Sequence, residues 1–88
     1  MNTEEKAVNL VLNILGSGEV ETVLNALEIT HPNPMSSAED YIRESKQILL
    51  DNNISLKKLF SETIKLLEDS RIEDVLNNFE YNTQELNI

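Results

Sequence analysis

The chain has 88 residues, with 16 acidic and 7 basic side chains and a formal net charge of −9 at pH 7 when its histidine is neutral. This charge disfavours direct binding to nucleic acid, because an acidic surface repels the phosphate backbone. Cysteine is absent, which excludes disulfides and thiolate metal sites and is typical of a reducing compartment, so we expect a cytoplasmic protein.

The composition is that of a folded helical protein. Apolar residues make up 40% of the chain, and only two glycines and two prolines interrupt it. The first residues lack the basic segment of a signal peptide, and no apolar run approaches the roughly 20 residues of a membrane span. We therefore expect neither a signal peptide nor an association with a membrane.

Two helices are predicted before Pro32. Thr3 is placed to cap the first helix, acidic residues follow in its first turn, where the helix dipole favours anions, and Gly16 marks its end. The second helix must end before Pro32, because proline disfavours the helical conformation of the preceding residue. The apolar residues of this second helix recur with the spacing of one helical face, at Val20, Val23, Leu24 and Leu27.

A connector and a third helix follow. His31 and the prolines on either side of Asn33 predict an extended connector. Ser36, with Glu39 three residues later, has the pattern of a capping box, so we expect a bridging helix over about residues 37–51. This helix ends in an Asp-Asn-Asn sequence, because asparagine tolerates the left-handed conformation found at helix C-termini.

Two more helices are predicted in the last third of the chain. Ser55 is expected to cap the fourth, and a second capping box, Ser70 with Glu73, is expected to begin the fifth. Beyond Glu80 the periodicity weakens, which indicates a fraying tail over about residues 82–88. The residues expected to face the core are Leu59, Phe60, Ile64 and Leu67 on the fourth helix and Ile72, Val75, Leu76 and Phe79 on the fifth.

The chain contains an internal repeat. Residues 3–28 align without a gap with residues 55–80, and 7 aligned positions are identical. We interpret the chain as a single all-α domain over residues 1–88, a compact bundle of about five short helices. Two duplicated helix-turn-helix hairpins are joined by the bridging helix, and each hairpin presents an apolar face that the other can cover.

The two copies differ at Leu10, which aligns with Glu62 and widens the apolar arc of the first helix. Two interpretations stay open. The third helix covers Leu10, or Leu10 lies in an oligomer interface with another copy of the chain, in which case the protein forms a homodimer.

The candidate partner-binding residues are acidic and amide side chains, most of which recur in both copies at i, i+4 and i+7, beside or opposite the apolar face. No lysine or arginine lies between Lys6 and Arg43 and none follows Arg71, so we expect these helices to lack a local counter-charge. The pattern favours a basic protein partner, and an ordinary solvated face is the alternative. The residues are Glu21, Asn25 and Glu28 in the first copy and Glu73, Asp74, Asn77 and Glu80 in the second.

No catalytic, cofactor or metal site is expected. Glu28 and His31 have the Glu-x-x-His spacing of di-iron bundles, but those sites need two such pairs and this chain has one histidine. We expect His31 to end the second helix, where its positive form would interact favourably with the dipole. Ser36 and Ser37 are expected to cap a helix and not to act as nucleophiles.

The charge pattern and the absence of a catalytic motif predict a non-enzymatic protein that acts by stoichiometric protein–protein interaction. An inhibitor, an immunity protein, an antitoxin-like neutraliser and a regulatory adaptor all fit this description. The alternatives are a structural homo-oligomer formed through the first helix and a nucleic-acid mimic that blocks a basic nuclease or DNA-binding protein. Residues 29–32 read ITHP, which resembles the His-Pro segment after the second helix of bacterial immunity proteins that neutralise nuclease toxins. The resemblance covers these residues and carries no residue roles to this chain.

Overall fold

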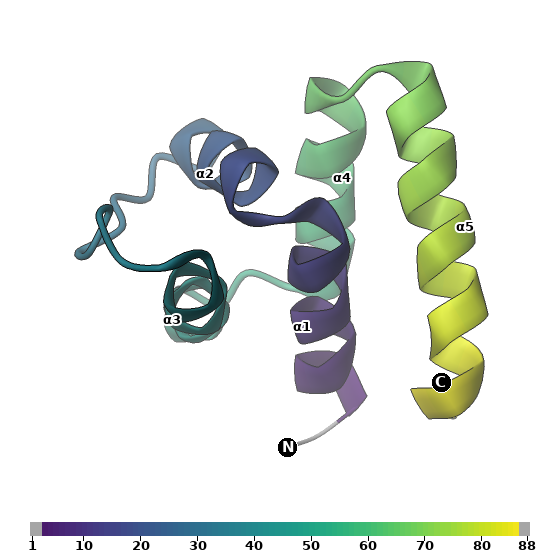
Figure 1. Cartoon of the computed structure of the whole chain (residues 1–88), viewed down its shortest axis with the longest axis horizontal. Helices are drawn as coiled ribbons and strands as arrows, with labels where there is room; N and C mark the ends of the chain where they lie inside the picture. Colours follow the sequence, from purple (N-terminus) through teal and green to yellow (C-terminus); the bar gives the residue numbers. More distant parts are fainter. Residues whose placement is uncertain (1–2, 87–88) are drawn as a thin grey trace.

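The computed structural model describes residues 3–86, which form five α-helices and, within that range, no strand (Figure 1). The prediction of an all-α bundle of about five short helices is confirmed. The last helix continues through Leu86, so the predicted tail over 82–88 is helical as far as it is described, and residues 87 and 88 lie outside the described residues. The helices are α1 (Thr3–Leu15), α2 (Ser17–Ala26), α3 (Ala38–Asp51), α4 (Leu56–Leu66) and α5 (Asp69–Leu86).

The central helix of the bundle is α1, which packs against each of the other four. In Figure 1, α1 and α5 stand upright beside each other, α4 lies behind α1, and α3 points along the line of sight. Because it is covered from several sides, α1 contributes a wide apolar arc to the core. The core consists of Val8, Val11, Leu12 and Leu15 of α1, Val20, Val23 and Leu24 of α2, Tyr41, Ile42 and Leu49 of α3, Leu59 of α4 and Val75 of α5.

The two copies of the repeat pack across each other. The first helix of each copy contacts the second helix of the other, because α1 packs along α5 and α2 packs against α4. Two hydrogen bonds also join positions that the repeat aligns. The N–H of Leu56 donates to the Glu4 carboxylate at 3.0 Å, and the Arg71 guanidinium donates to the Glu19 carboxylate at 2.7 Å. Aligned residues of the two copies therefore contact each other where the copies cross.

The first copy departs from the expected hairpin. Gly16 alone connects α1 to α2, and the two helices turn through 115° instead of running antiparallel. The φ angle of Gly16 is 84°, a conformation that a residue with a Cβ atom rarely adopts. In the second copy Leu67 has an ordinary φ of −101°, and α5 returns antiparallel to α4 (Figure 1). The connecting residues therefore give the two copies different shapes.

The capping residues predicted from the sequence mark some helix starts correctly and misplace others. Ser55 caps α4 as expected. The cap of α3 is Ser37 and not Ser36, whose hydroxyl instead donates to a carbonyl of the connector. The predicted capping box at Ser70 is also wrong, because α5 already begins at Asp69. The predicted cap at Thr3 is wrong for the same reason, since α1 begins at Thr3 itself.

Two residues expected in the core lie on the surface. Ile64 of α4 is 50% exposed and Leu76 of α5 is 42% exposed. Beneath them Phe60 and Phe79 are only half-buried, and their rings meet edge to face with centroids 4.9 Å apart. The prediction is wrong for Ile64 and Leu76 because the rest of the bundle covers only one side of the α4–α5 pair.

No single helix in the described range is long and apolar enough to cross a membrane. Only α1 and α2 taken together reach that length and composition, and this pair is bent by 115°. Their apolar side chains supply more than half of the core residues named above.

Candidate partner-binding surface

The structure places all the candidate partner-binding residues on the surface, in two groups. The Arg71 side chain, in the first turn of α5, reaches Glu19 in the first turn of α2. Otherwise α2 and α5 lie apart, on opposite sides of α4 (Figure 1). The groups therefore form two separate surfaces. We call Glu21, Asn25 and Glu28 the α2 group, and Glu73, Asp74, Asn77 and Glu80 the α5 group.

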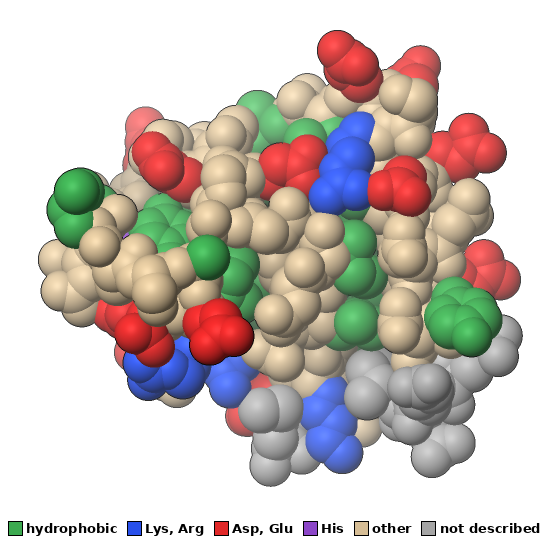
Figure 2. Space-filling view, viewed as in Figure 1, with side chains coloured by type: hydrophobic (Ala, Val, Ile, Leu, Met, Phe, Trp, Pro, Cys, Tyr) green, Lys and Arg blue, Asp and Glu red, His purple; other side chains and the backbone are tan. Residues whose placement is uncertain are grey.

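The Arg71 side chain joins three helices. Its Nε and Nη2 atoms donate to the carboxylate of Glu19, and Nη2 also donates to the carbonyl of Ile14 at 2.9 Å. Its Nη1 atom donates to Asp74. The bonds to Glu19 hold the pKa of Arg71 above its ordinary value, and the bond to Asp74 adds to that effect. Figure 2 shows that most of the charged side chains on the face it displays are acidic, with few basic ones among them.

The expectation that α2 and α5 lack a counter-charge is therefore wrong in part. Arg71 pairs with Glu19 and also with Asp74, a member of the α5 group, so one positive charge partly offsets two negative ones. No ion pair within the described residues involves Glu21 or Glu28. The described residues thus leave the negative charge of Glu21 and Glu28 without an ion-pair partner.

Glu28 lies in a tight turn that closes the C-terminus of α2. Its N–H donates to the carbonyl of Asn25 at 3.0 Å, and the N–H of Ile29 donates to the carbonyl of Leu24 at 2.9 Å. This pair of bonds is the Schellman motif, in which the residue after the cap takes a left-handed conformation and is usually glycine or asparagine. Glu28 has a φ of 60° and occupies that position.

The end of α3 shows the same motif with the expected residue. Asn53 has a φ of 58°, and its N–H donates to the carbonyl of Leu50, while the N–H of Ile54 donates to the carbonyl of Leu49. The Asp-Asn-Asn signal for the end of this helix is confirmed. The turns after α2 and α3 therefore have the same backbone hydrogen bonds, but the left-handed residue is a glutamate after α2 and an asparagine after α3.

Negative charge gathers at the C-terminal end of α2. The last turn of this helix has no basic residue, and Glu28 follows the last carbonyls of the helix, which carry a partial negative charge. Glu21 adds to this field. Burial raises the pKa of the Tyr41 hydroxyl, and the negative charge of Glu21 raises it further. The combined field would attract a cation from solution.

The connector after α2 is fixed to α3 by His31. Its ring stacks on that of Tyr41 with centroids 4.1 Å apart, and its Nδ1 atom accepts the N–H of Asn33 at 2.9 Å. The prediction that His31 ends α2 as a positive residue is wrong, because α2 ends at Ala26 and the ring is buried against α3 with one nitrogen acting as an acceptor. No group of three metal-ligating side chains occurs in the part of the chain that the structure describes.

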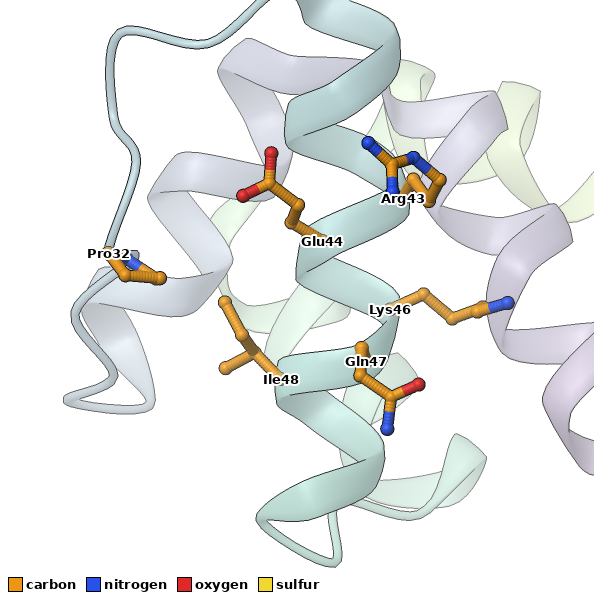
Figure 3. A pocket seen from close by; sticks show the side chains of 6 residues that line it. All are labelled: Pro32, Arg43, Glu44, Lys46, Gln47 and Ile48. Carbon is orange, nitrogen blue, oxygen red and sulfur yellow. The ribbon is translucent and has the colours of Figure 1, made fainter.

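A cavity of about 370 Å³ lies along the outer side of α3 (Figure 3). Two of the three charged side chains around it have partners, since Arg43 pairs with Asp40 and Glu44 accepts a hydrogen bond from Asn33. Nothing in its lining forms a nucleophile–base pair. The lining residues are Pro32, Arg43, Glu44, Lys46, Gln47 and Ile48.

Leu10, the candidate oligomer contact, is half-buried on α1, and α1 packs against α3. Both interpretations of this residue stay open. Comparison of the chain with protein-family models, with curated proteins and with solved structures found no match. Its function must therefore be inferred from its own residues and their geometry.

Sequence reasoning missed two features that the structure brings forward. The contact of Arg71 with Glu19 had a signal in the repeat, because the alignment places an arginine opposite a glutamate. The left-handed conformation of Glu28 had no such signal, since glutamate is not a residue that marks this turn.

Proposed function

We propose that the protein acts without catalysis, by stoichiometric binding of a basic protein partner through the α2 group. An inhibitor, an immunity protein, an antitoxin-like neutraliser and a regulatory adaptor all work in this way. A cytoplasmic location is part of the proposal.

The position of Glu28 is the observation that carries the proposal. A left-handed conformation costs a residue with a Cβ atom about 1–2 kcal/mol, and an anion at a helix C-terminus is unfavourable by roughly 0.3–1 kcal/mol. Glu28 has both disadvantages. In the equivalent turn after α3 the left-handed position is held by Asn53, and asparagine tolerates that conformation. A side chain that weakens the fold at an exposed position is best explained by a role in binding.

The surroundings of Glu28 suit a cationic ligand surface. Glu21 and Asn25 are exposed on the same helix, one helical turn apart, and Glu28 follows at the end of that helix. Complementary charge would speed the encounter with a basic partner and help to select it. Because exposed charges are screened by salt, the complex should weaken as ionic strength rises.

Affinity capture with charge-reversed variants tests the proposal. The wild-type protein and a Glu21→Lys, Glu28→Lys variant would serve as tagged baits, with washes at low salt and at about 0.5 M salt, where the screening length falls to a few ångströms. A Glu39→Lys, Glu68→Lys variant is the matched control, because it changes the net charge equally at exposed positions outside the α2 group.

We expect one basic protein to be retained at low salt by the wild type and by the control, and to be lost at high salt and with the α2 variant. Equal retention by both variants would show that the α2 group is not the binding surface. Recovery of no basic protein would remove the basis for the proposal.

A further inference from the structure

An apolar strip lies uncovered on the surface formed by α4 and α5. Each helix contributes three side chains at i, i+4 and i+7, so the three lie in a row along the helix. Ile64 and Leu76, at the centres of the two rows, are 50% and 42% exposed, and the other four are half-buried. We call this surface the α4–α5 face, and it consists of Phe60, Ile64, Leu67, Ile72, Leu76 and Phe79.

The α4–α5 face is the outer layer of the apolar sides of α4 and α5. Phe60, Leu67 and Phe79 pack against the core, whereas Ile64 and Leu76 are exposed. Leu59 and Thr63 are the buried residues of α4, and Val75 is buried on α5. At 100° per residue, Ile64 lies about 100° around α4 from Thr63, and Leu76 lies about 100° around α5 from Val75. The rest of the bundle covers the buried sides, and among the described residues nothing covers Ile64 and Leu76 at the centre of the α4–α5 face. Two antiparallel helices with an exposed apolar face are half of a four-helix bundle.

The two edges of this face carry opposite charges. On α4, Lys57 is exposed and lies about 20° from Ile64. Lys65 is exposed further around the helix, where it also pairs with Glu62 at 3.5 Å, so Lys57 is the main basic residue of this edge. On α5, Glu80 and Glu73 are exposed and lie about 40° and 60° beyond Leu76. One edge is therefore basic and the other acidic.

The lysines of α4 and the glutamates of α5 also lie at matching heights along the helix axes. The Phe60–Phe79 contact fixes the height of α5 relative to α4. Counting 1.5 Å per residue from that contact places Lys57 within about 3 Å of the height of Glu80, and it places Lys65 within about 2 Å of the height of Glu73.

We propose that the α4–α5 face is a homodimer interface and that its occupant is a second copy of this chain. A twofold axis parallel to the helices lays α4 of one copy over α5 of the other, which brings Lys57 to Glu80 and Lys65 to Glu73 on both edges. The product is an antiparallel four-helix bundle with an apolar centre. A uniformly basic partner would instead meet the lysines of the α4 edge, so charge favours the second copy.

This interface goes beyond the proposed function and leaves its surface free. The α2 group lies on a helix that takes no part in the α4–α5 face, so the dimer would present two such groups to solvent. Glu73 and Glu80 of the α5 group then belong to the edge of the dimer. Failure of either proposal can be recognised separately, because dimerisation is measured on the isolated protein.

Light scattering and sedimentation equilibrium of charge variants test the interface. The wild type should show twice the chain mass of 10.0 kDa. Leu76→Glu should give a folded monomer, with circular dichroism as the control for folding. Lys57→Glu and Glu80→Lys should each weaken dimerisation about tenfold, because each places like charges together at two symmetry-related positions.

Mixing the two charge variants provides the decisive comparison. A dimer of one Lys57→Glu chain and one Glu80→Lys chain has opposite charges at both edges, so the mixture should dimerise as tightly as the wild type. A wild type that stays monomeric at millimolar concentration would overturn the proposal. A dimer that survives Leu76→Glu but is lost on Leu10→Glu would also overturn it, since the interface would then lie on α1.

Discussion

Replacing Glu28 with asparagine should stabilise the protein. The substitution removes a glutamate from the left-handed conformation with φ of 60° and removes a carboxylate from the C-terminus of α2, while both backbone hydrogen bonds of the turn remain. The conformational gain is roughly 1 kcal/mol, because asparagine tolerates this region better than most residues, and the electrostatic gain is about 0.3–1 kcal/mol. Together they predict a rise of about 1–2 kcal/mol in the free energy of unfolding, or at least about 4 °C in Tm for a domain of this size.

The assay is urea denaturation of the wild type and the variant at one protein concentration, since any dimer would make the apparent stability depend on concentration. Asn53→Glu is the matched control, because it introduces the same unfavourable pair of features at the end of α3. It should lower the free energy of unfolding by a similar amount. A Glu28→Asn variant no more stable than the wild type would refute the reasoning.

Three further predictions concern stability. Arg71→Met should lower the free energy of unfolding by about 1–3 kcal/mol, because it removes charge-assisted bonds to Glu19 and to a carbonyl of α1. Arg43→Met, which removes an exposed ion pair, should lower it much less. Gly16→Ala should lower the free energy of unfolding by about 1 kcal/mol or more, because alanine is strained at a φ of 84°. A clash would not contribute, since no atom lies within 4 Å of an added Cβ. Equal stability of the variant and the wild type in urea denaturation would disprove this. The hydrogen bond from Arg43 lowers the pKa of Asp40 below its ordinary 3.8, so its ionised form adds stability at neutral pH that is lost as pH falls below that value. Asp40→Asn should therefore flatten the loss of stability below about pH 4 in acid titrations, and an unchanged slope would count against the pairing.

Local signals predicted the elements of this fold well. Ser55 caps α4 and Asn53 closes α3, because each acts through hydrogen bonds or conformations within a few residues of its own position. The start of α3 was misplaced by one residue, since Ser36 and Ser37 have the same chemistry and only the path of the connector selects between them. Such choices depend on tertiary structure.

Packing was harder to predict than helix formation. Periodicity shows that Ile64 and Leu76 lie on apolar sides of their helices, but it does not say whether another element covers those sides. On α4 and α5 the apolar arc is wider than the bundle can cover, so the outer residues reach the surface. The partner of Arg71 likewise follows from the crossing of the two repeat copies, which no local pattern encodes.

The candidate site was predicted in position but not in its distinguishing feature. The spacing of Glu21, Asn25 and Glu28 correctly indicated exposed side chains. That Glu28 occupies a conformation suited to glycine or asparagine depends on where α2 ends, and Pro32 set only an outer limit to that helix.

The central claim is that Glu28 is retained for binding although it weakens the fold. Its most direct test is to measure, for the wild type and for Glu28→Asn, both the free energy of unfolding and the dissociation constant of the captured basic partner at low salt. We expect the variant to be more stable and to bind the partner about tenfold more weakly, a change of about 1.4 kcal/mol. A variant that gains stability and binds the partner as tightly as the wild type would contradict the claim.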